Sequence, residues 1–380
     1  MNLKIVIFGL SITSSWGNGH ATTYRALVKA LYQRGHHLTF IERDVPWYRD
    51  NRDLTNTDSC RIELYEHLSD VPHRFGSLVA DADLVILGSY VPEGAKLADW
   101  LITRARGITA FYDIDTPVTL LGLRTGETFY ISAALIPRFD LYLSFTGGPT
   151  LSLIEEEYAS PRARVLHCAA DVDVVPAAAP HCRWMLGYIG TYSADRQPAL
   201  ESLMFETSHQ LPQERFVVAG CQYPENIAWP PNVALIEHQP QTRHAEFYRS
   251  QRYTLNITRK DMRAAGFSPS VRLFEAAAFG VPIVSDKWRG LDTLFTPGRE
   301  ILVVDGTHEL VQLLSQLSEE RRREIAAAAH QRLLKSHAPQ HRARQLESYY
   351  EEAIASRRIA TRVGIVARRG AIDRTCDAKT

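Results

Sequence analysis

The stretch FSPSVRLFEAAAFGVPIVSD, residues 267–286, combines a polar start, an apolar helical run and a short β-branched strand. Pro269 suits the first position of a helix, because its missing N–H would have no partner there. Ser268 suits the N-cap before it. At about 100° per residue, Ser268, Arg272 and Glu275 lie on one face of the predicted helix. The remaining side chains are apolar, so an unpaired charge on this helix would be costly.

Two interpretations of this charged face are open. Arg272 and Glu275 could form an ion pair three residues apart within the helix. Alternatively, the free N–H groups at the helix N-terminus could bind a phosphate together with Ser268, Ser270 and Arg272. Glu275, further along the helix, could then accept hydrogen bonds from a ribose diol. A nucleotide has this shape, with phosphates at one end and ribose hydroxyls at the other.

Outward from this stretch, β-branched runs alternate with helical periodicity, which predicts an α/β fold with parallel sheets and crossover helices. A segment with two prolines, residues 172–180, reads as a linker between two such units. We therefore predict two Rossmann-like domains that face a cleft. The expected strands are residues 3–8, 37–42, 84–89, 108–113 and 141–145, then residues 183–190, 215–220, 233–238, 253–258, 281–286 and 300–305.

The predicted domain boundaries follow from this pattern. Residues 1–178 form the first domain, residues 179–337 the second, and residues 338–358 a C-terminal helix. From residue 357 the chain holds seven Lys or Arg against two Asp. We expect residues 359–380 to be a disordered, solvated tail, with weak contact to a membrane surface or an acidic polymer as the alternative.

The bulk composition narrows the class of protein. Among 380 residues, 43 Lys and Arg balance 43 Asp and Glu, so no net field favours nucleic acid. The five cysteines show no C-x-x-C spacing, which indicates reduced thiols in the cytoplasm and no zinc site. The N-terminal run MNLKIVIFGL leads into a strand–loop–helix pattern, so we interpret it as a core strand rather than a targeting segment. No apolar run reaches the ~18 residues of a membrane span.

The run S-P-S-V-R-L-F-E-A-A-A-F-G-V-P-I-V-S-D resembles the donor site of GT-B glycosyltransferases of the group 1 type. It is similar in particular to the subgroup of spore-coat glycosyltransferase-like proteins, which have an Arg three residues before the Glu. The resemblance covers most of residues 183–305 and the first half only in outline. It implies a GT-B fold, with Glu275 on the donor ribose. The diphosphate side would comprise Ser268, Ser270, Val271 and Arg272.

One departure concerns the stereochemistry of transfer. Many retaining members of the family carry a second Glu eight residues before the first, and here that position is Phe267. The resemblance therefore leaves open whether transfer retains or inverts the anomeric configuration.

Two further segments of the second half also resemble the family. In GYIGTYSADRQPAL, residues 187–200, the strand–glycine turn would hold the diphosphate, with Arg196 near the usual basic position. The turn residues are Gly190, Thr191 and Tyr192. In IEHQPQTRHAEFY, residues 236–248, the nucleobase would meet His238, Gln239 and His244. Arg196 could equally be a surface residue.

The loop GLSITSSWGNGH, residues 9–20, follows the first predicted strand. It is rich in glycine but does not match G-x-G-x-x-G, which disfavours a dinucleotide-binding fingerprint. We expect Gly17, Asn18 and Gly19 to face the acceptor or the phosphates. His20 would lie at the start of the next helix, where a lowered pKa suits a general base. The alternative is a capping or packing role for His20.

Two acids and two glycines follow later strands of the first half. In YDIDTP, residues 112–117, Asp113 and Asp115 stand at a strand end, where α/β ligands collect. Either could orient an acceptor hydroxyl or act as base, and Asp115 could instead cap the next helix. Gly147 and Gly148 precede a proline-started helix, a further candidate contact for an anion or a sugar.

We therefore expect a cytoplasmic, metal-independent glycosyltransferase. The donor would be a nucleoside diphosphate sugar, in the first instance a UDP-sugar, with no other cofactor. The acceptor hydroxyl would belong to a glycan, a lipid or a protein. Two alternatives stay open: a nucleotide-sugar epimerase of the same fold, which converts the donor alone, and a non-enzymatic factor in surface-polymer assembly.

Overall fold

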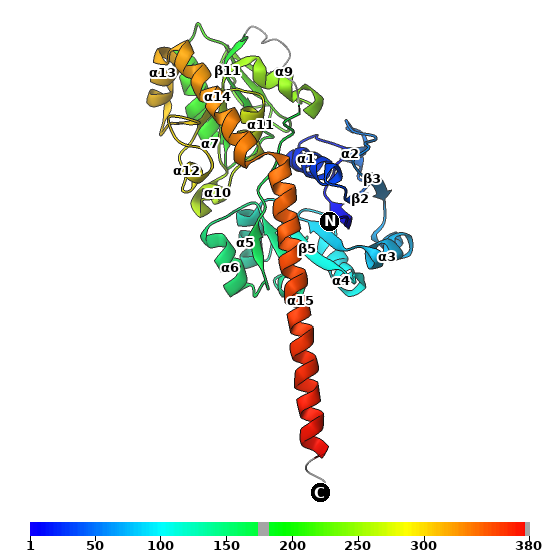
Figure 1. Ribbon diagram of the computed structural model, residues 1–380. Helices are drawn as coiled ribbons and strands as arrows, with labels where there is room; N and C mark the ends of the chain where they lie inside the picture. Colours follow the sequence, from blue (N-terminus) through cyan, green and yellow to red (C-terminus); the bar gives the residue numbers. More distant parts are fainter. Residues whose placement is uncertain (174–181, 377–380) are drawn as a thin grey trace.

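The computed structural model describes residues 1–173 and 182–376, with side chains as far as residue 359. The described chain forms two α/β units stacked one above the other, with a long C-terminal helix that runs along the first unit (Figure 1). The predicted linker and the predicted boundary at residue 178 fall almost entirely outside the described residues.

The first domain is built on a parallel sheet with the strand order β3-β2-β1-β4-β5-β6-β7. Its strands are β1 (Lys4–Gly9), β2 (His37–Arg43), β3 (Arg61–Tyr65), β4 (Leu84–Gly88), β5 (Ile108–Asp113), β6 (Leu141–Ser144) and β7 (Ala163–Val165). Its helices are α1 (Gly19–Gln33), α2 (Pro46–Arg49), α3 (Val71–Asp81), α4 (Gly94–Arg104), α5 (Thr116–Thr125) and α6 (Pro149–Glu157), with 3₁₀ turns η1 (Leu68–Asp70) and η2 (Ile136–Arg138).

The second domain repeats the arrangement, with the parallel strand order β10-β9-β8-β11-β12-β13. Its strands are β8 (Trp184–Ile189), β9 (Phe216–Ala219), β10 (Val233–Ile236), β11 (Gln251–Asn256), β12 (Ile283–Ser285) and β13 (Leu302–Val303). Its helical elements are α7 (Gln197–Leu200), η3 (Glu201–Glu206), α8 (Thr207–Gln210), η4 (Gln241–Arg243), α9 (His244–Arg249), α10 (Lys260–Ala265), α11 (Val271–Ala278), α12 (Leu291–Leu294), α13 (Thr307–Gln316) and α14 (Glu319–Ser336).

The two sheets confirm the prediction of two Rossmann-like domains. Their central strands are buried nearly throughout, as the continuous apolar runs of β1, β4 and β8 require in sheets covered on both faces. The strand order reverses between β1 and β4 in the first sheet and between β8 and β11 in the second. The loops after β1 and β8 therefore lie at the two switch points. Ligands of open α/β sheets bind at such points.

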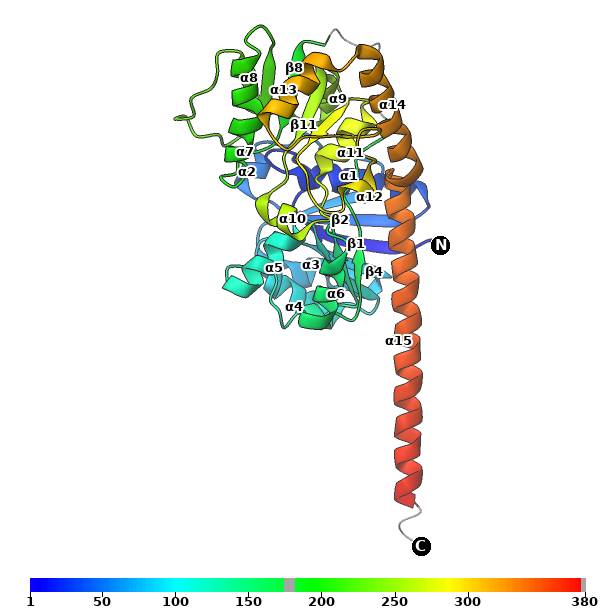
Figure 2. The ribbon, with the colours of Figure 1, turned by 90° about the vertical axis from the view of Figure 1, so that its left-hand side faces the viewer.

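Helix α15 (Pro339–Cys376) follows α14 after a short break and returns to the first domain. Glu347 of α15 contacts Arg34 at 2.6 Å and the buried His36 at 2.8 Å, and Arg357 contacts Asp140 at 2.6 Å. Both ribbon views show α15 running along the first domain and past its edge (Figures 1 and 2).

The structure differs from the prediction of a disordered tail. The backbone of residues 359–376 continues α15 instead of leaving the fold as an irregular segment. The physical reason is that a helix that already exists extends at low cost, and no proline follows Pro339 to stop it. Residues 377–380 lie outside the described part.

The described helices contain none with the length and apolarity needed to span a bilayer.

Candidate functional site

A cavity of about 480 Å³ lies between the domains, at the carboxyl ends of both sheets. The first domain contributes the loop after β1 together with Tyr90 and Asp115. The second domain contributes the loops after β8, β9, β10 and β11 and the N-terminal half of α11. The cleft predicted from the sequence is thus a defined cavity with walls from both domains.

Most of the residues predicted for the site line this cavity. They are Gly17, Asn18, Gly19, His20, Asp115, Gly190, Thr191, Arg196, His238, Gln239, Ser270, Val271, Arg272 and Glu275. Asp113, Tyr192 and Ser268 do not line it.

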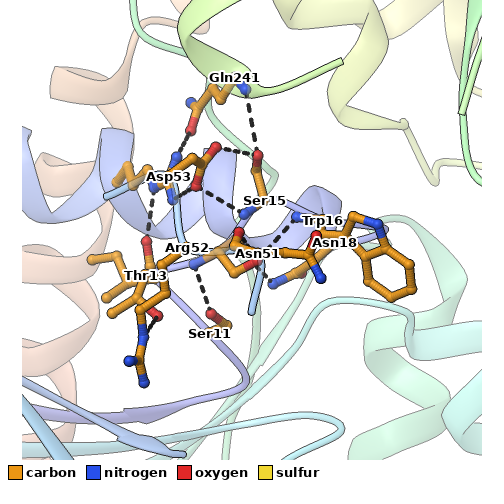
Figure 3. Close-up of polar contacts among 12 residues, drawn as sticks. Ser11, Thr13, Ser15, Trp16, Asn18, Asn51, Arg52, Asp53 and Gln241 are labelled. Carbon is orange, nitrogen blue, oxygen red and sulfur yellow. Dashed lines mark hydrogen bonds and ion pairs between the residues drawn. The ribbon is translucent and has the colours of Figure 1, made fainter. Parts of the chain in front are cut away.

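Hydrogen bonds to neighbouring segments fix the loop after β1. The buried Glu42 carboxylate accepts from the backbone N–H groups of Ile12 and Thr13 at 2.7 and 3.1 Å. Asp53 accepts from the backbone N–H of Ser15 at 3.1 Å, and Ser15 also reaches the second domain (Figure 3). The loop is therefore held by carboxylates at several points along its length.

The end of this loop starts helix α1. Asn18 is the N-cap, and its side-chain oxygen accepts from the backbone N–H of His20 at 3.0 Å. Gly17 has φ of +59°, a conformation that glycine adopts without steric cost. A side chain at Gly19 would meet Val271 of α11 at 3.6 Å, so the two domains approach closely here.

His20 faces the cavity from the first turn of α1, as predicted. Burial lowers the pKa of His20, which nearby Asp115 partly offsets, while Arg259 lowers it further. Its buried Nδ1 has no hydrogen-bond partner among the described residues. A neutral imidazole on the cavity wall can accept a proton, so the position of His20 is compatible with the predicted base.

The two acids after β5 face different environments. Asp115 lines the cavity and accepts from the Tyr90 hydroxyl at 3.1 Å. Asp115 is the N-cap residue of α5 but makes no side-chain capping bond, so the proposed capping role is absent. Its carboxylate is instead 3.4 Å from the Arg259 guanidinium across the cleft.

Asp113 points into the first domain rather than the cavity, which corrects its prediction as a cleft residue. It is fully buried and bonded to the hydroxyls of Tyr142 and Thr119. Burial raises the pKa of Asp113 to about 7, against the lowering effect of those two hydrogen bonds. The last residue of a strand can face either layer, and the alternation of side chains turns Asp113 inward.

The donor-site helix begins two residues later than predicted. Ser270, not Ser268, is the N-cap of α11, and its side chain makes no capping bond. Ser268 is buried, and its hydroxyl lies 2.8 Å from that of Thr146 in the first domain. Pro269 therefore precedes the helix, and Ser268 joins the domains instead of facing a phosphate.

Arg272 does not pair with Glu275. Its Nε donates to the Ile189 carbonyl at 2.7 Å, and its Nη1 donates to Asn256 at 2.8 Å. Its guanidinium carbon lies 4.7 Å from the centre of the Tyr188 ring. These contacts hold the charge at the end of β8, beside the α11 N-terminus. The ion-pair alternative for this helix is therefore wrong.

The turn after β8 brings the backbone close to Arg272. A Cβ on Gly190 would lie 3.0 Å from Nη2 of Arg272 and 2.8 Å from the Tyr188 hydroxyl. A Cβ on Gly220 would lie 2.0 Å from the Gly190 carbonyl oxygen. A larger residue at Gly220 would push the backbone of the turn out of place, whereas one at Gly190 would displace the ends of the Arg272 and Tyr188 side chains.

Arg196 also faces the cavity rather than bulk solvent. Its Nη2 donates to the Thr191 carbonyl at 2.7 Å, while its buried Nε has no partner within the described chain. Tyr192 turns away and packs on Tyr223, with ring centres 5.7 Å apart. The basic residue predicted near the diphosphate thus lies on the cavity wall, and the tyrosine does not.

Glu275 lies at the inner wall, 4% exposed. One carboxylate oxygen is 2.8 Å from Nδ1 of His244, and the other accepts from the Tyr248 hydroxyl at 2.9 Å. Burial would raise the pKa of Glu275, but His244 and Tyr248 outweigh it and leave the pKa below the usual range. Glu275 is therefore an ionised acceptor on the cavity wall.

Sequence reasoning missed Arg259 and Tyr90, which meet over Asp115. Arg259 follows β11 and lies between Asp115 at 3.4 Å and Asp195 at 3.7 Å. Burial lowers the pKa of Arg259, but Asp115 and the other neighbours outweigh it and raise the pKa above the usual range. The signal was present in the sequence, since Arg259 stands at a strand end where ligands collect.

In the described residues, no group of three or more His, Cys, Asp or Glu side chains could hold a metal ion. The positive charges on the cavity wall come instead from the side chains of Arg196, Arg259 and Arg272.

Comparison with solved structures decides the fold family. Sucrose-phosphate synthase from Thermosynechococcus elongatus superimposes with a TM-score of 0.68 at 13% identity, over 93% of this chain and 100% of that chain. The Anabaena protein HepE, in complex with UDP and glucose, gives 0.68 at 12% identity, over 92% and 100%. An alpha-glucosyltransferase in complex with UDP gives 0.65 at 15% identity, over 93% and 100%. The fold is GT-B.

Two sequence comparisons also point to glycosyl transferases or to a curated enzyme. Residues 196–348 match the family described as "Glycosyl transferase-like". The "Bifunctional enzyme NodQ" of Rhizobium sp. (strain BR816) is 28% identical over 161 residues, which are 42% of this chain. The match spans only 23% of that protein. The spore-coat subgroup stays a prediction, because the matched family is broader.

Proposed function

We propose that this protein is a glycosyltransferase that uses a nucleoside diphosphate sugar, specifically a UDP-sugar, as donor. The observation that carries the proposal is the cavity face of α11. Ser270 at its N-cap, Arg272 in its first turn and Glu275 one turn further along line one wall. Their spacing suits a nucleotide with its diphosphate at the helix end and its ribose at the carboxylate. The GT-B fold and solved neighbours that hold UDP support the same ligand.

In this proposal the arginines act on the leaving group. Transfer breaks the bond between the anomeric carbon and the β-phosphate oxygen, and negative charge builds on the diphosphate. Arg272, Arg196 and the free N–H groups of α11 would stabilise that charge, without a bound metal ion. Arg272 needs no reorganisation, because Ile189 and Asn256 already fix it.

The acceptor would enter from the first domain. His20 and Asp115 line that side of the cavity, close enough for Asp115 to affect the His20 pKa. The acceptor oxygen forms the new bond to the anomeric carbon, and its proton must leave. His20 is our candidate to receive that proton, with Asp115 and Tyr90 orienting the acceptor hydroxyl.

The test is UDP binding, measured by thermal shift and calorimetry with a chelator present. Wild type should be stabilised by UDP through mass action. Glu275→Ala should lose most of the shift, because the ribose loses its acceptor. Glu246→Ala is the matched control, since Glu246 lies on the exposed surface of α9 and forms an ion pair with Arg243, 3.1 Å away.

The outcomes of this test are distinct. A full UDP shift in Glu275→Ala would exclude the ribose role. A shift in wild type that disappears with the chelator would contradict metal-independent donor binding.

A further inference from the structure

His244 lies behind Glu275 with both ring nitrogens placed against acceptors. Its Nδ1 is 2.8 Å from a carboxylate oxygen of Glu275. Its Nε2 is 3.1 Å from the backbone carbonyl oxygen of Gln239. The side chain is 11% exposed, so water can replace neither contact freely.

This arrangement restricts the protonation state of His244. A neutral imidazole donates from one nitrogen and accepts at the other. The ionised Glu275 carboxylate and the Gln239 carbonyl can only accept, so a neutral ring would leave two acceptors facing each other at one contact. Both contacts are hydrogen bonds only when both nitrogens carry a proton.

We infer that His244 acts as an imidazolium that positions Glu275 for the donor ribose, and that donor affinity falls when His244 loses its proton. The inference rests on the proposed function for the identity of the ligand. The protonation of His244 can be measured without any ligand.

The charged groups around His244 favour the cation. Burial lowers the pKa of His244, but Glu275 and the Gln239 carbonyl outweigh burial and leave the pKa above its ordinary value. Asp53 of the first domain adds in the same direction. His238, on the loop after β10, opposes the charge when it is protonated, and burial lowers the pKa of His238.

The other groups at Glu275 are consistent with a positioning role. Tyr248 donates to the second carboxylate oxygen at 2.9 Å, and the Thr22 hydroxyl of the first domain lies 3.5 Å from the first. Arg272, one turn away, adds positive charge that lowers the Glu275 pKa. A carboxylate has about four lone-pair sites, so the ribose diol can still be accepted while His244 and Tyr248 fix the rotamer.

Two substitutions separate the two contacts of the ring. The amide nitrogen of Asn can take the place of Nδ1, so His244→Asn keeps a donor toward Glu275 and removes the titration. The amide nitrogen of Gln reaches the place of Nε2, so His244→Gln keeps the contact to Gln239 and loses the one to Glu275. His308→Asn is the control, because exposed His308 pairs with Gln312 and does not line the cavity.

The measurement is the Kd of UDP across about pH 6 to 9, a range that begins near the ordinary histidine pKa of about 6.5 and extends above it. Wild type and His308→Asn should lose about tenfold in affinity as the pH rises, the size expected for one hydrogen bond to a charged group. His244→Asn should lack this tenfold loss and show only the pH dependence that comes from UDP and from the groups it shares with wild type. His244→Gln should bind about tenfold more weakly at low pH. Titration of the UDP phosphates affects all variants equally, so it cancels when their Kd values are compared at the same pH.

A second readout uses the free protein. The histidine ring signal that is absent from the NMR spectrum of His244→Asn should titrate above the ordinary value of about 6.5. A ring that titrates below that value overturns the inference, and so does a parallel pH dependence of Kd in wild type and His244→Asn. Failure of wild type to bind UDP at any pH would instead contradict the proposed function, and the ring titration would still decide the state of His244.

Discussion

At the scale of single residues, the two acids after β5 give a direct contrast. Asp115 lines the cavity beside His20, whereas Asp113 is buried among Tyr142 and Thr119. We predict that Asp115→Asn and His20→Ala lower kcat and kcat/KM together while the Kd of UDP holds. A positioned acid or base contributes about 10²–10⁴-fold. Asp113→Asn should stay within a few-fold of wild type.

The check is steady-state kinetics on the three variants with calorimetry of UDP in parallel. A larger loss in Asp113→Asn than in Asp115→Asn would show that the buried carboxyl takes part in the chemistry. That result would contradict the assignment of roles.

The sequence predicts the residues of α11 better than those of the first domain, for a physical reason. Arg272 and Glu275 are charges on an otherwise apolar helix, which needs an explanation in any fold. Asp113 and Asp115 look equivalent in sequence, and only the direction of each side chain separates them. Arg259 escaped notice because an arginine near a strand end is common on protein surfaces. Its place in the site is evident only in the structure, where Asp115 of the first domain lies opposite Arg259.

At the scale of elements, the central strands and the glycine turns follow from the sequence. The edge strands β3 and β7 do not, because β3 is only partly buried with a charged start and β7 has three residues. Helix α11 also begins later than predicted, because the Ser268 hydroxyl contacts Thr146 of the first domain instead of capping the helix. Contacts between distant segments of this kind leave no local pattern.

Helix α15 carries a prediction about stability. Glu347 holds it to Arg34 and to the buried His36 of the first domain. Glu347→Ala should cost about 1–3 kcal/mol, because His36 then keeps a buried nitrogen without its partner. Tm should fall by a few degrees.

Two controls accompany this substitution. Glu351→Ala, exposed on the same helix, should leave Tm unchanged. Deletion of residues 360–380 should also leave Tm within about 2 °C, because the ribbon views show the end of α15 passing beyond the first domain. Equal losses for Glu347→Ala and for the deletion would mean that the end of α15 stabilises the body.

At the scale of the whole molecule, contacts across the cleft link the first domain to the second. Arg25 of the first domain donates to Gln241 of the second at 2.6 Å, and Gln241 also donates from its backbone to Ser15 at 3.3 Å (Figure 3). Gly147 donates to the Phe267 carbonyl at 2.9 Å. The domains thus meet on more than one side of the cavity, which would exclude water from a bound donor.

The position of Phe267 shows what sequence reasoning could not settle. Its ring packs where side chains on Gly148 and Gly290 would lie, at 2.5 and 2.3 Å, so it fills a gap between the domains. The second carboxylate of many retaining relatives has no replacement at this position. In the proposed function, contacts to the transferred sugar would therefore come from other residues, and His20, Asp115 and Arg259 are candidates because they line the cavity.

The central claim is sugar transfer from a UDP-sugar at the α11 face, and product analysis of a UDP-sugar panel tests it most directly. Wild type, with a chelator and candidate acceptors present, should release UDP from at least one donor, by transfer or by slow hydrolysis. Glu275→Ala should release UDP at least about tenfold more slowly than wild type, and Glu246→Ala should release it at the wild-type rate. Conversion of a donor to an isomeric UDP-sugar without UDP release would indicate an epimerase. Release of no UDP from any donor by wild type would contradict the account.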